Sequence, residues 1–356
     1  MSRPRFHALQ ISAIARETED GVAVTLAIPP TLRDEFAFAP GQYLTVHRPG
    51  APDDERRSYS ICSQPGAPGI TLGVREIPGG VVSTWLNRVA RAGDRLECMP
   101  PDGQFGAQAL TAQPRHLLLI AAGSGITPLL SIAESALAAH PKNRITLLYG
   151  NRTVASMLFR EALTELKDRY LDRFDLHCVF SREPQDIALH EGRLDGAKLR
   201  AFLGSLIPVD TVDDAFLCGP NAMLDEATGV LLEAGLGASH IHVERFGAPD
   251  TVLPVNTTPH ALNQARLTLI LDGKTRIIPV EDSRTTVLDA ARAAGLDLPF
   301  SCRTGVCATC RAKVLAGEVE MARNFALLED DLKAGIILTC QAHPVTAEVT
   351  VSFDDR

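Results

Sequence analysis

"CRTGVCATC", residues 302–310, places three of the chain's eight cysteines within nine residues. Disulfide bonds are one explanation for this spacing. However, the N-terminal stretch "MSRPRFHALQISAIA" has no apolar run followed by a small-residue cleavage site that would direct export. We therefore expect a cytoplasmic, reducing setting, in which clustered cysteines more often bind metal or carry out redox chemistry.

The spacing of the cysteines is itself informative. Four residues separate Cys302 from Cys307, two separate Cys307 from Cys310, and Cys340 follows further along the chain. This is the spacing of the thiolate ligands in plant-type [2Fe–2S] proteins. Small residues such as Gly305 would let backbone N–H groups point at the sulfur atoms. A zinc site is the alternative, although zinc more often uses two C-x2-C pairs, and only one is present.

The sequence around the cysteines predicts a small α+β domain of the β-grasp type over residues 265–356. Two apolar runs flank Asp272-Gly273, which is typical of a tight hairpin. A short helix is expected next, with Thr285 or Thr286 as N-cap and Gly295 just after its end. The stretch before this domain is rich in Pro, Thr and Asn, so we expect a linker at residues 248–264.

Residues 111–247 alternate apolar strands with amphipathic helices, which is typical of an α/β domain with a parallel sheet. Ligands of such sheets bind beyond the carboxyl ends of the strands. The predicted strands are 116–121, 145–149, 176–180, 215–217 and 241–243. The segments that follow the first four are "GSGITP" (123–128), "GNRT" (150–153), "SREP" (181–184) and "CGPNAM" (218–223).

The first of these segments is a candidate pyrophosphate site. Gly123 and Gly125 would allow a close approach of the backbone, and Thr127 is expected to cap a helix whose N-terminus faces the anion. An ordinary strand-to-helix turn stays open as the alternative, because the third glycine of the dinucleotide fingerprint is absent.

The first 110 residues contain short alternating strands broken by Pro and Gly, so we expect a small antiparallel β-barrel. "RRSYSICS" (56–63) lies on one such strand and offers Arg57, Tyr59 and Ser60 as a cation, an aromatic plane and a hydroxyl. "PGGVVS" (78–83) starts a helix and is a second candidate phosphate site. Taken alone, each motif is better explained as a surface strand or a plain helix cap.

Composition narrows the function classes. A length of 356 residues suggests two or three domains, and 45% hydrophobic residues are enough for several cores. A formal charge of −8 disfavours nucleic acid as the main partner. No apolar run reaches the length of about 18 residues that a membrane span requires. We expect neither nucleic acid nor a membrane as partner.

The order of the motifs "RSYS", "GGVVS", "GSGITP", "CGP" and the clustered cysteines resembles the ferredoxin-NADP⁺ reductase superfamily with a carboxy-terminal plant-type ferredoxin. The motifs "PGQYLTV", "IAAGSGITPLLSI", "LLYGNRT", "HVERF" and "GVCATCRAKVLAG" are also similar to those in reductase components of phenylacetyl-CoA epoxidases. Reductases of ketosteroid 9α-hydroxylases, which are Rieske systems, share most of them. The resemblance covers essentially the whole chain and implies three domains: 1–110 for FAD, 111–247 for NAD(P)H and 265–356 for [2Fe–2S].

The resemblance also implies roles for individual residues. Ser60, Cys218 and Phe246 would lie at the reacting ends of flavin and nicotinamide, although Cys218 could equally be a buried apolar thiol. The cluster ligands would be Cys302, Cys307, Cys310 and Cys340. The residues expected to contact FAD or NADPH are Arg57, Ser58, Tyr59, Ser60, Val74, Arg75, Gly80, Val81, Ser83, Gly123, Gly125, Thr127, Arg152, Ser181, Arg182, Cys218, Gly219, Pro220 and Phe246.

The implied activity is electron transfer from NADPH through FAD and a [2Fe–2S] cluster to an oxygenase, most closely a di-iron phenylacetyl-CoA epoxidase. A flavin is needed because nicotinamide delivers two electrons as a hydride, whereas the cluster accepts one at a time. A Rieske oxygenase as partner, a stand-alone diaphorase and FMN in place of FAD are the alternatives. A scaffold that keeps the cluster only for structure or sensing is a further one.

Coenzyme preference is predicted from the strand ends. Arg152, Ser181 and Arg182 would favour the 2′-phosphate of NADPH, whereas Glu183 argues for NADH. A surface ion pair between Arg182 and Glu183 would remove the argument for either coenzyme.

Overall fold

The structure is a computed structural model that describes residues 6–52, 55–248, 264–282 and 284–355. The chain forms two compact units. One contains His7–Glu55 and Tyr59–Arg245, and the other contains Met1–Phe6, Arg56–Ser58 and Phe246–Arg356. We call them the large unit and the C-terminal unit. The linker predicted at 248–264 lies almost entirely outside the described residues.

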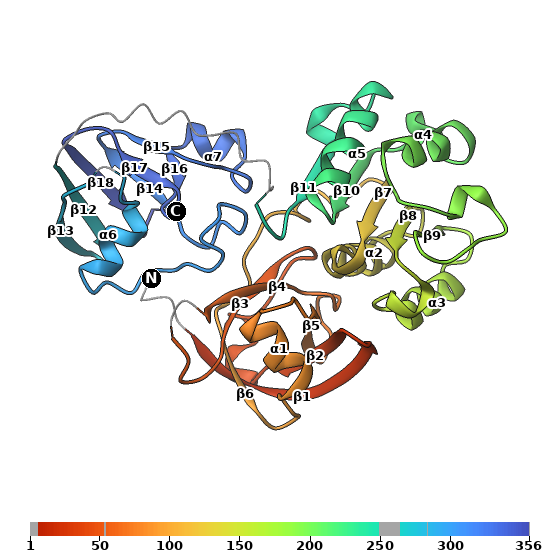
Figure 1. The fold of residues 1–356 in the computed structure, drawn as a ribbon, viewed down its shortest axis with the longest axis horizontal. Coiled ribbons are helices and arrows are strands. Elements are labelled where there is room, and N and C mark those ends of the chain that lie inside the picture. The colour runs from red at the N-terminus through yellow and green to blue at the C-terminus, as the bar shows by residue number, and fades with distance from the viewer. Residues whose placement is uncertain (1–5, 53–54, 249–263, 283, 356) are drawn as a thin grey trace. The chain divides into compact units, whose positions relative to one another are not determined.

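The first half of the large unit is an antiparallel sheet, as predicted, with strand order β4-β3-β6-β1-β2-β5. A bridge between Ile61 and Leu72 brings the residue after β4 onto β5 and so closes the sheet into a barrel. Helix α1 packs against β5 and β2, with Val82 and Leu86 in the barrel core (Figure 1). The elements are β1 (His7–Thr18), β2 (Gly21–Ala27), β3 (Tyr43–His47), β4 (Arg57–Ser60), β5 (Gly69–Arg75), α1 (Val81–Arg88) and β6 (Arg95–Cys98).

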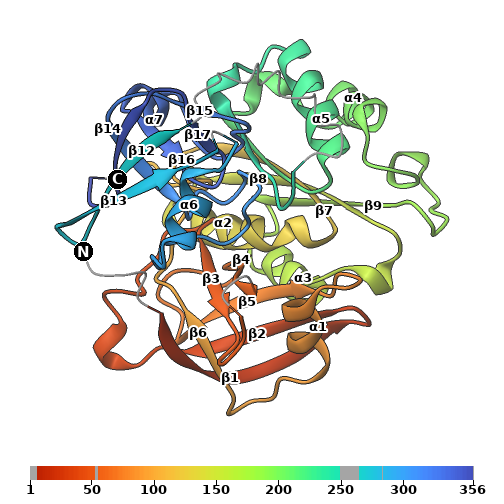
Figure 2. The same cartoon turned by 60° about the vertical axis from the view of Figure 1, so that its left-hand side comes forward.

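The second half of the large unit is a five-stranded parallel sheet with order β11-β10-β7-β8-β9. Its strands are β7 (His116–Ala122), β8 (Arg144–Asn151), β9 (Phe174–Phe180), β10 (Asp214–Cys218) and β11 (Ile241–Glu244). The five predicted strands are therefore confirmed. Figure 2 shows α2 and α3 on one side of this sheet and α4 and α5 on the other. The helices are α2 (Ile126–Ala139), α3 (Arg160–Arg169), α4 (Gly196–Ser205) and α5 (Asn221–Glu233).

The C-terminal unit contains the predicted hairpin and helix. Asp272 and Gly273 both have positive φ and join β12 to β13, and Thr286 caps α6 by accepting a hydrogen bond from Asp289 N–H. Five strands have the order β13-β12-β18-β14-β16, and β15 pairs with β17. The elements are β12 (Ala265–Leu271), β13 (Lys274–Val280), α6 (Val287–Ala293), β14 (Arg311–Ala316), β15 (Val319–Met321), α7 (Glu329–Lys333), β16 (Ile336–Leu338), β17 (Ala342–Pro344) and β18 (Glu348–Ser352).

Within the large unit, the barrel packs closely against the start of α2 and α3. A Cβ atom at Gly73 of β5 would lie 2.3 Å from Thr127 Cγ2 and 2.8 Å from Phe159 Cε2. Phe159 has a left-handed backbone with φ of 58°, and its N–H donates to the Glu17 carboxylate of β1 at 2.9 Å. A side chain at position 73 would therefore push the barrel away from the nucleotide sheet.

We predict that Gly73→Ala destabilises the protein by about 1–3 kcal/mol, because an added methyl group in a packed contact forces its neighbours to shift. Gly229→Ala is the matched control: Gly229 lies inside α5 with nothing within 4 Å of an added Cβ. The control should be neutral or stabilising by up to about 1 kcal/mol, because Ala favours helices. Urea unfolding of both variants measures this, and equal midpoints for Gly73→Ala and the natural protein would contradict the packing argument.

Candidate functional site

The four predicted cluster ligands come together in the C-terminal unit. Cys302 lies beside Cys307 and Cys310 beside Cys340, and the hydrogen bond within each pair lowers the pKa of Cys302 and of Cys340. All eight cysteines of the chain are free thiols, so disulfides do not explain the stretch. In the described residues no three His, Cys, Asp or Glu side chains converge on one ion. Cysteine thiolates are the ligands of [2Fe–2S] clusters, so these four cysteines fit such a cluster by their chemistry and spacing.

The backbone of the cysteine loop has an unusual conformation that suits such a cluster. Arg303, Gly305 and Ala308 all have positive φ, between 54° and 83°. Successive turns of this kind make backbone N–H groups point inward toward an anion. One of them already does so, since Thr304 N–H donates to Cys302 Sγ at 3.4 Å. The Gln341 side chain donates to Cys340 Sγ at 3.5 Å, so hydrogen-bond donors reach sulfur from both ligand segments.

In the large unit, the turns after β7 and β10 lie against each other. A Cβ at Gly125 would lie 2.0 Å from the carbonyl oxygen of Cys218, and one at Gly219 would lie 3.2 Å from Ala122 N. Gly125 is therefore required for this contact, and Gly219 packs closely beside it. The contact places the N-terminus of α2 next to the end of β10, where a dinucleotide could run from one turn to the other.

The predicted helix start at this turn is wrong by two residues. A 3₁₀ turn covers Gly123–Gly125 and α2 begins at Ile126, so Gly125 is the N-cap and Thr127 lies inside the helix. The Thr127 hydroxyl donates to Ser124 O at 2.9 Å, and its methyl group packs on Gly73. The backbone N–H groups at the start of α2, rather than the Thr127 hydroxyl, are the available donors for a pyrophosphate.

A partly buried carboxyl group lies between the two predicted catalytic residues of the large unit. Ser60 Oγ donates to Glu244 Oε2 at 3.4 Å, and Glu244 pairs with Cys218 in the register of β11 and β10. Burial raises the pKa of Glu244 to about 8, with the Ser60 hydrogen bond opposing the shift. Burial, and to a smaller extent Glu244, also raises the pKa of the Cys218 thiol. At neutral pH the site therefore holds a protonated carboxyl group and a protonated thiol.

Glu244 was not among the predicted site residues. It directly follows the predicted strand 241–243, so the rule that ligands bind beyond strand ends would have selected it. The sequence around it, "HVERF", resembles an ordinary exposed edge strand. Its burial depends on contacts with β10 and with Ser60 that no local pattern reveals.

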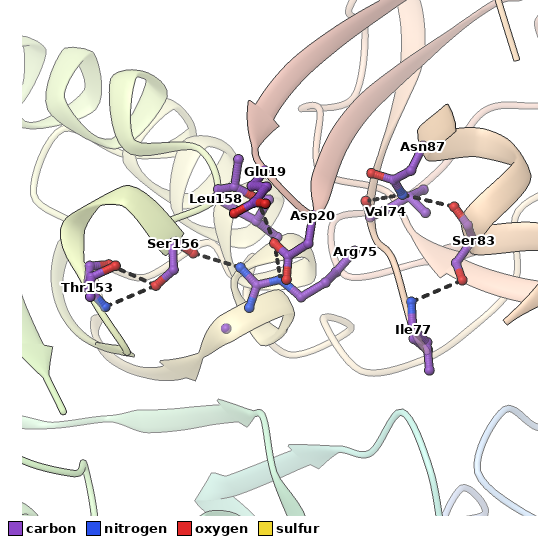
Figure 3. Close-up of polar contacts among 12 residues, drawn as sticks. Glu19, Asp20, Val74, Arg75, Ile77, Ser83, Asn87, Thr153, Ser156 and Leu158 are labelled. Carbon is purple, nitrogen blue, oxygen red and sulfur yellow. Dashed lines mark hydrogen bonds and ion pairs between the residues drawn. The ribbon is translucent and has the colours of Figure 1, made fainter. Parts of the chain in front are cut away.

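Arg75 reaches the Gly123 turn from the barrel. Its guanidinium donates to Ser156 O at 2.7 Å and forms an ion pair with Asp20 at 3.5 Å, as Figure 3 shows. One of its nitrogens would lie 3.1 Å from a Cβ at Gly123. Arg75 is therefore a cation beside the candidate pyrophosphate turn, and its predicted contact with a cofactor stays a prediction.

The turn before α1 is arranged differently from a simple phosphate site. Gly80 is the N-cap of α1, as expected, but the Ser83 side chain is buried. Its hydroxyl accepts a hydrogen bond from Ile77 N–H at 3.2 Å, which Figure 3 shows, and donates to Gly80 O at 3.3 Å. Ser83 thus stabilises the turn, and contact of its hydroxyl with a flavin phosphate stays a prediction. Val81, which is half exposed, begins the helix.

The predicted coenzyme residues at the ends of β8 and β9 are neighbours. Arg182 N–H donates to Arg152 O at 2.8 Å, and Ser181 N–H donates to Asn151 O at 3.0 Å. Both arginine side chains are exposed, and neither forms an ion pair within the part of the chain that the structure describes. The alternative of a surface pair between Arg182 and Glu183 is therefore not observed.

Other predicted residues have less defined surroundings. Val74 is fully buried in the barrel core, so only its backbone could face a flavin. Tyr59 packs against the same core, and Pro220 is exposed at the start of α5. Arg57 and Ser58 begin β4, whereas the half-exposed Phe246 belongs to the C-terminal unit, so the structure does not place Phe246 relative to Tyr59 and Ser60. Their roles stay predictions.

Three domain families match successive parts of the chain. The oxidoreductase FAD-binding domain matches residues 9–106, the oxidoreductase NAD-binding domain 119–228, and the 2Fe-2S iron-sulfur cluster binding domain 269–345. These matches confirm the predicted cofactor set of FAD, a nicotinamide coenzyme and a [2Fe–2S] cluster. No helix in the described residues is long and apolar enough to cross a membrane.

Full-length relatives have the same organisation. One component of the 1,2-phenylacetyl-CoA epoxidase from Escherichia coli is 43% identical over 99% of this chain and 98% of its own. The ferredoxin reductase component of 3-ketosteroid-9-alpha-monooxygenase from Mycobacterium tuberculosis is 35% identical over 98% and 96%. The structure of phthalate dioxygenase reductase aligns over 98% of both chains with a TM-score of 0.58 and 24% identity, which shows a shared fold.

The three domain matches, the gathered thiols and the full-length relatives agree with one another. The chain is an NAD(P)H-dependent flavin iron–sulfur oxidoreductase, and it belongs to the ferredoxin reductase family that joins an FAD-binding barrel, an NAD-binding domain and a carboxy-terminal [2Fe–2S] domain in one polypeptide.

Proposed function

We propose that this chain is the cytoplasmic reductase component of a phenylacetyl-CoA epoxidase and supplies its di-iron oxygenase with electrons from NADPH. The observation that carries the proposal is the presence of all four cluster thiols in the same chain as the flavin and nucleotide domains. A cluster that accepts single electrons allows electrons to leave one at a time for another protein. The 43% identity to a component of the Escherichia coli enzyme favours the epoxidase as that acceptor.

We further propose the domain limits 1–110 for FAD, 111–247 for NADPH and 265–356 for the cluster. The matched ranges fall inside these limits. Bound FAD would accept a hydride from the coenzyme and release electrons singly to the cluster. The remaining chemistry belongs to residues of this chain.

Ser60, Cys218 and Glu244 would form the reacting end of the site. Overall, NADPH gives up a hydride while the acceptor takes two electrons, so one proton per NADPH must be released. Burial raises the pKa of Glu244 to about 8, so its carboxyl group would already be protonated and neutral, and Ser60 would link it to the barrel. The released proton would therefore pass to solvent. Cys218 stays a neutral thiol and so adds no charge that would oppose the approach of a hydride.

Reconstitution tests the partner. The purified reductase would be combined with the oxygenase subunits of a phenylacetyl-CoA epoxidase or with the Rieske oxygenase of a ketosteroid 9α-hydroxylase, and NADPH-dependent product formation would be measured. The proposal requires turnover with the first. A reductase that supports only the ketosteroid enzyme would favour the alternative suggested by the 35% identical relative. Dye reduction together with no turnover by either oxygenase would favour a stand-alone diaphorase.

Replacing Cys340 with Ser should remove most of the iron, because [2Fe–2S] clusters of this type are held by thiolates. Transfer to cytochrome c should be lost with the iron. NADPH-dependent ferricyanide reduction should remain, since that acceptor can take electrons from the flavin. Cys178→Ser is the matched control, because Cys178 is a free thiol on β9 in the large unit. Full iron content in the Cys340→Ser protein would refute the ligand assignment.

Glu244→Gln should change how stability depends on pH. The pKa of Glu244 is about 8 in the folded protein and 4.5 ordinarily, so between these values the unfolded chain releases a proton that the folded protein retains. The stabilisation from this group is therefore complete below pH 4.5 and lost as pH rises to about 8, by at most about 1.4 kcal/mol per pH unit. Glutamine cannot ionise, so the variant should lose this slope. Urea midpoints at pH 5, 6, 7 and 8 measure it, and parallel curves for both proteins would exclude the raised pKa.

Arg182→Ala should raise the KM for NADPH about tenfold with little change in kcat, because the lost contact to the 2′-phosphate is remote from the hydride. The KM for NADH should stay the same. Arg193→Ala, which removes another exposed arginine from the connection between β9 and α4, should leave both constants unchanged. Equal kcat/KM for the two coenzymes in the natural protein would exclude the preference for NADPH.

A further inference from the structure

Glu183 is an acidic residue beside the two arginines proposed to select NADPH. In related nucleotide-binding sheets, a carboxylate at a strand end binds the ribose hydroxyls of NADH. By that rule, Glu183 would oppose the arginines that flank it. Its observed contacts indicate a different role, and the inference rests on the coenzyme preference proposed above.

The Glu183 carboxylate is directed at the neighbouring turn. Its Oε2 accepts a hydrogen bond from Val154 N–H at 2.8 Å. Val154 begins the 3₁₀ turn Val154–Ser156, two residues after Arg152. A charged acceptor on a backbone N–H forms one of the stronger hydrogen bonds in proteins, so this contact fixes the turn after β8 to the turn after β9.

Backbone hydrogen bonds extend the same connection. Arg182 N–H donates to Arg152 O at 2.8 Å and Ser181 N–H to Asn151 O at 3.0 Å, so the two strand ends stay paired beyond the sheet. On its other side, the turn is held by Ser156, whose hydroxyl bonds Thr153 and whose carbonyl accepts from Arg75 (Figure 3). The backbone that carries Arg152 is therefore held at both ends.

We propose that Glu183 is a positioning residue for the 2′-phosphate of the coenzyme. It holds the turn bearing Arg152 next to the turn bearing Arg182, and its carboxylate is not the ligand of the adenosine ribose. Two exposed guanidinium groups at adjacent strand ends then face one phosphate dianion. Arginine matches phosphate oxygens with paired N–H donors, provided that its backbone is fixed at the right distance.

The two possible roles of Glu183 predict opposite results for a change to glutamine. The amide oxygen of the glutamine in Glu183→Gln would still accept from Val154 N–H, so positioning would persist and removal of the negative charge would not harm phosphate binding. If the carboxylate instead bound the ribose diol, its loss would weaken the binding of nucleotides that lack the 2′-phosphate. Alanine removes the acceptor and should loosen the turn.

The experiment measures binding of two fragments, 2′,5′-ADP and 5′-AMP, which differ in the 2′-phosphate. Calorimetry would use the full-length holoprotein and its Glu183→Gln and Glu183→Ala variants. We expect the natural protein to bind 2′,5′-ADP at least about tenfold more tightly than 5′-AMP. Glu183→Gln should keep this ratio of affinities within about twofold of the natural value. Glu183→Ala should lower the ratio about three- to tenfold, because binding of 2′,5′-ADP weakens while binding of 5′-AMP does not change.

Glu191→Ala is the matched control, because Glu191 accepts from Gln185 N–H at 3.4 Å in the same connection. It should leave the ratio unchanged. Flavin content and urea midpoints of each variant detect general unfolding. Weaker 5′-AMP binding by Glu183→Gln, or an unchanged ratio in Glu183→Ala, would overturn the positioning role. A natural protein that bound both fragments equally would instead overturn the preference for NADPH and, with it, this inference.

Discussion

The close packing of Gly73 against Thr127 and Phe159 is the contact on which the large unit depends. It leaves no room for a side chain, so the last two residues of β5, Val74 and Arg75, lie next to the start of α2. Gly125 makes a comparable contact with the Cys218 carbonyl at the end of β10. Together these contacts bring one barrel strand and two turns of the parallel sheet to the same place. A hydride can pass between two bound cofactors only at short range. The function therefore requires glycine at positions 73 and 125, because a side chain at either would push these segments apart.

The fold could be predicted in large part because its signals are local. Unbroken apolar runs identified the five parallel strands, and Asp272-Gly273 identified the hairpin. The spacing of the cysteines identified the cluster loop, since four thiolates on two irons require a particular order along the chain. The predictions that failed concerned residues whose positions depend on contacts between segments distant in sequence. Thr127 was expected to cap α2, but the contact of Gly125 with β10 moved the cap to that glycine.

The site could be predicted less completely than the fold for the same reason. Glu244 was missed because a carboxyl group is charged in most settings, and only the tertiary surroundings of this one raise its pKa. The tertiary contacts of other predicted residues were not visible in the sequence either. The Ser83 hydroxyl accepts from Ile77 N–H within the turn before α1, and Arg75 lies beside the Gly123 turn. Their contacts with a cofactor stay predictions.

The order of the parallel strands separates reaction from recognition. Cys218 and Glu244 end β10 and β11 on one side of β7, whereas Arg152 and Arg182 follow β8 and β9 on the other. The turn Gly123–Gly125 ends β7 between them. A dinucleotide with its pyrophosphate at that turn would have its nicotinamide near the protonated carboxyl group and its adenosine near the arginines. The charge proposed to select the coenzyme would therefore be kept away from the neutral groups proposed to lie where the hydride moves, and each end could change in sequence without disturbing the electrostatics of the other.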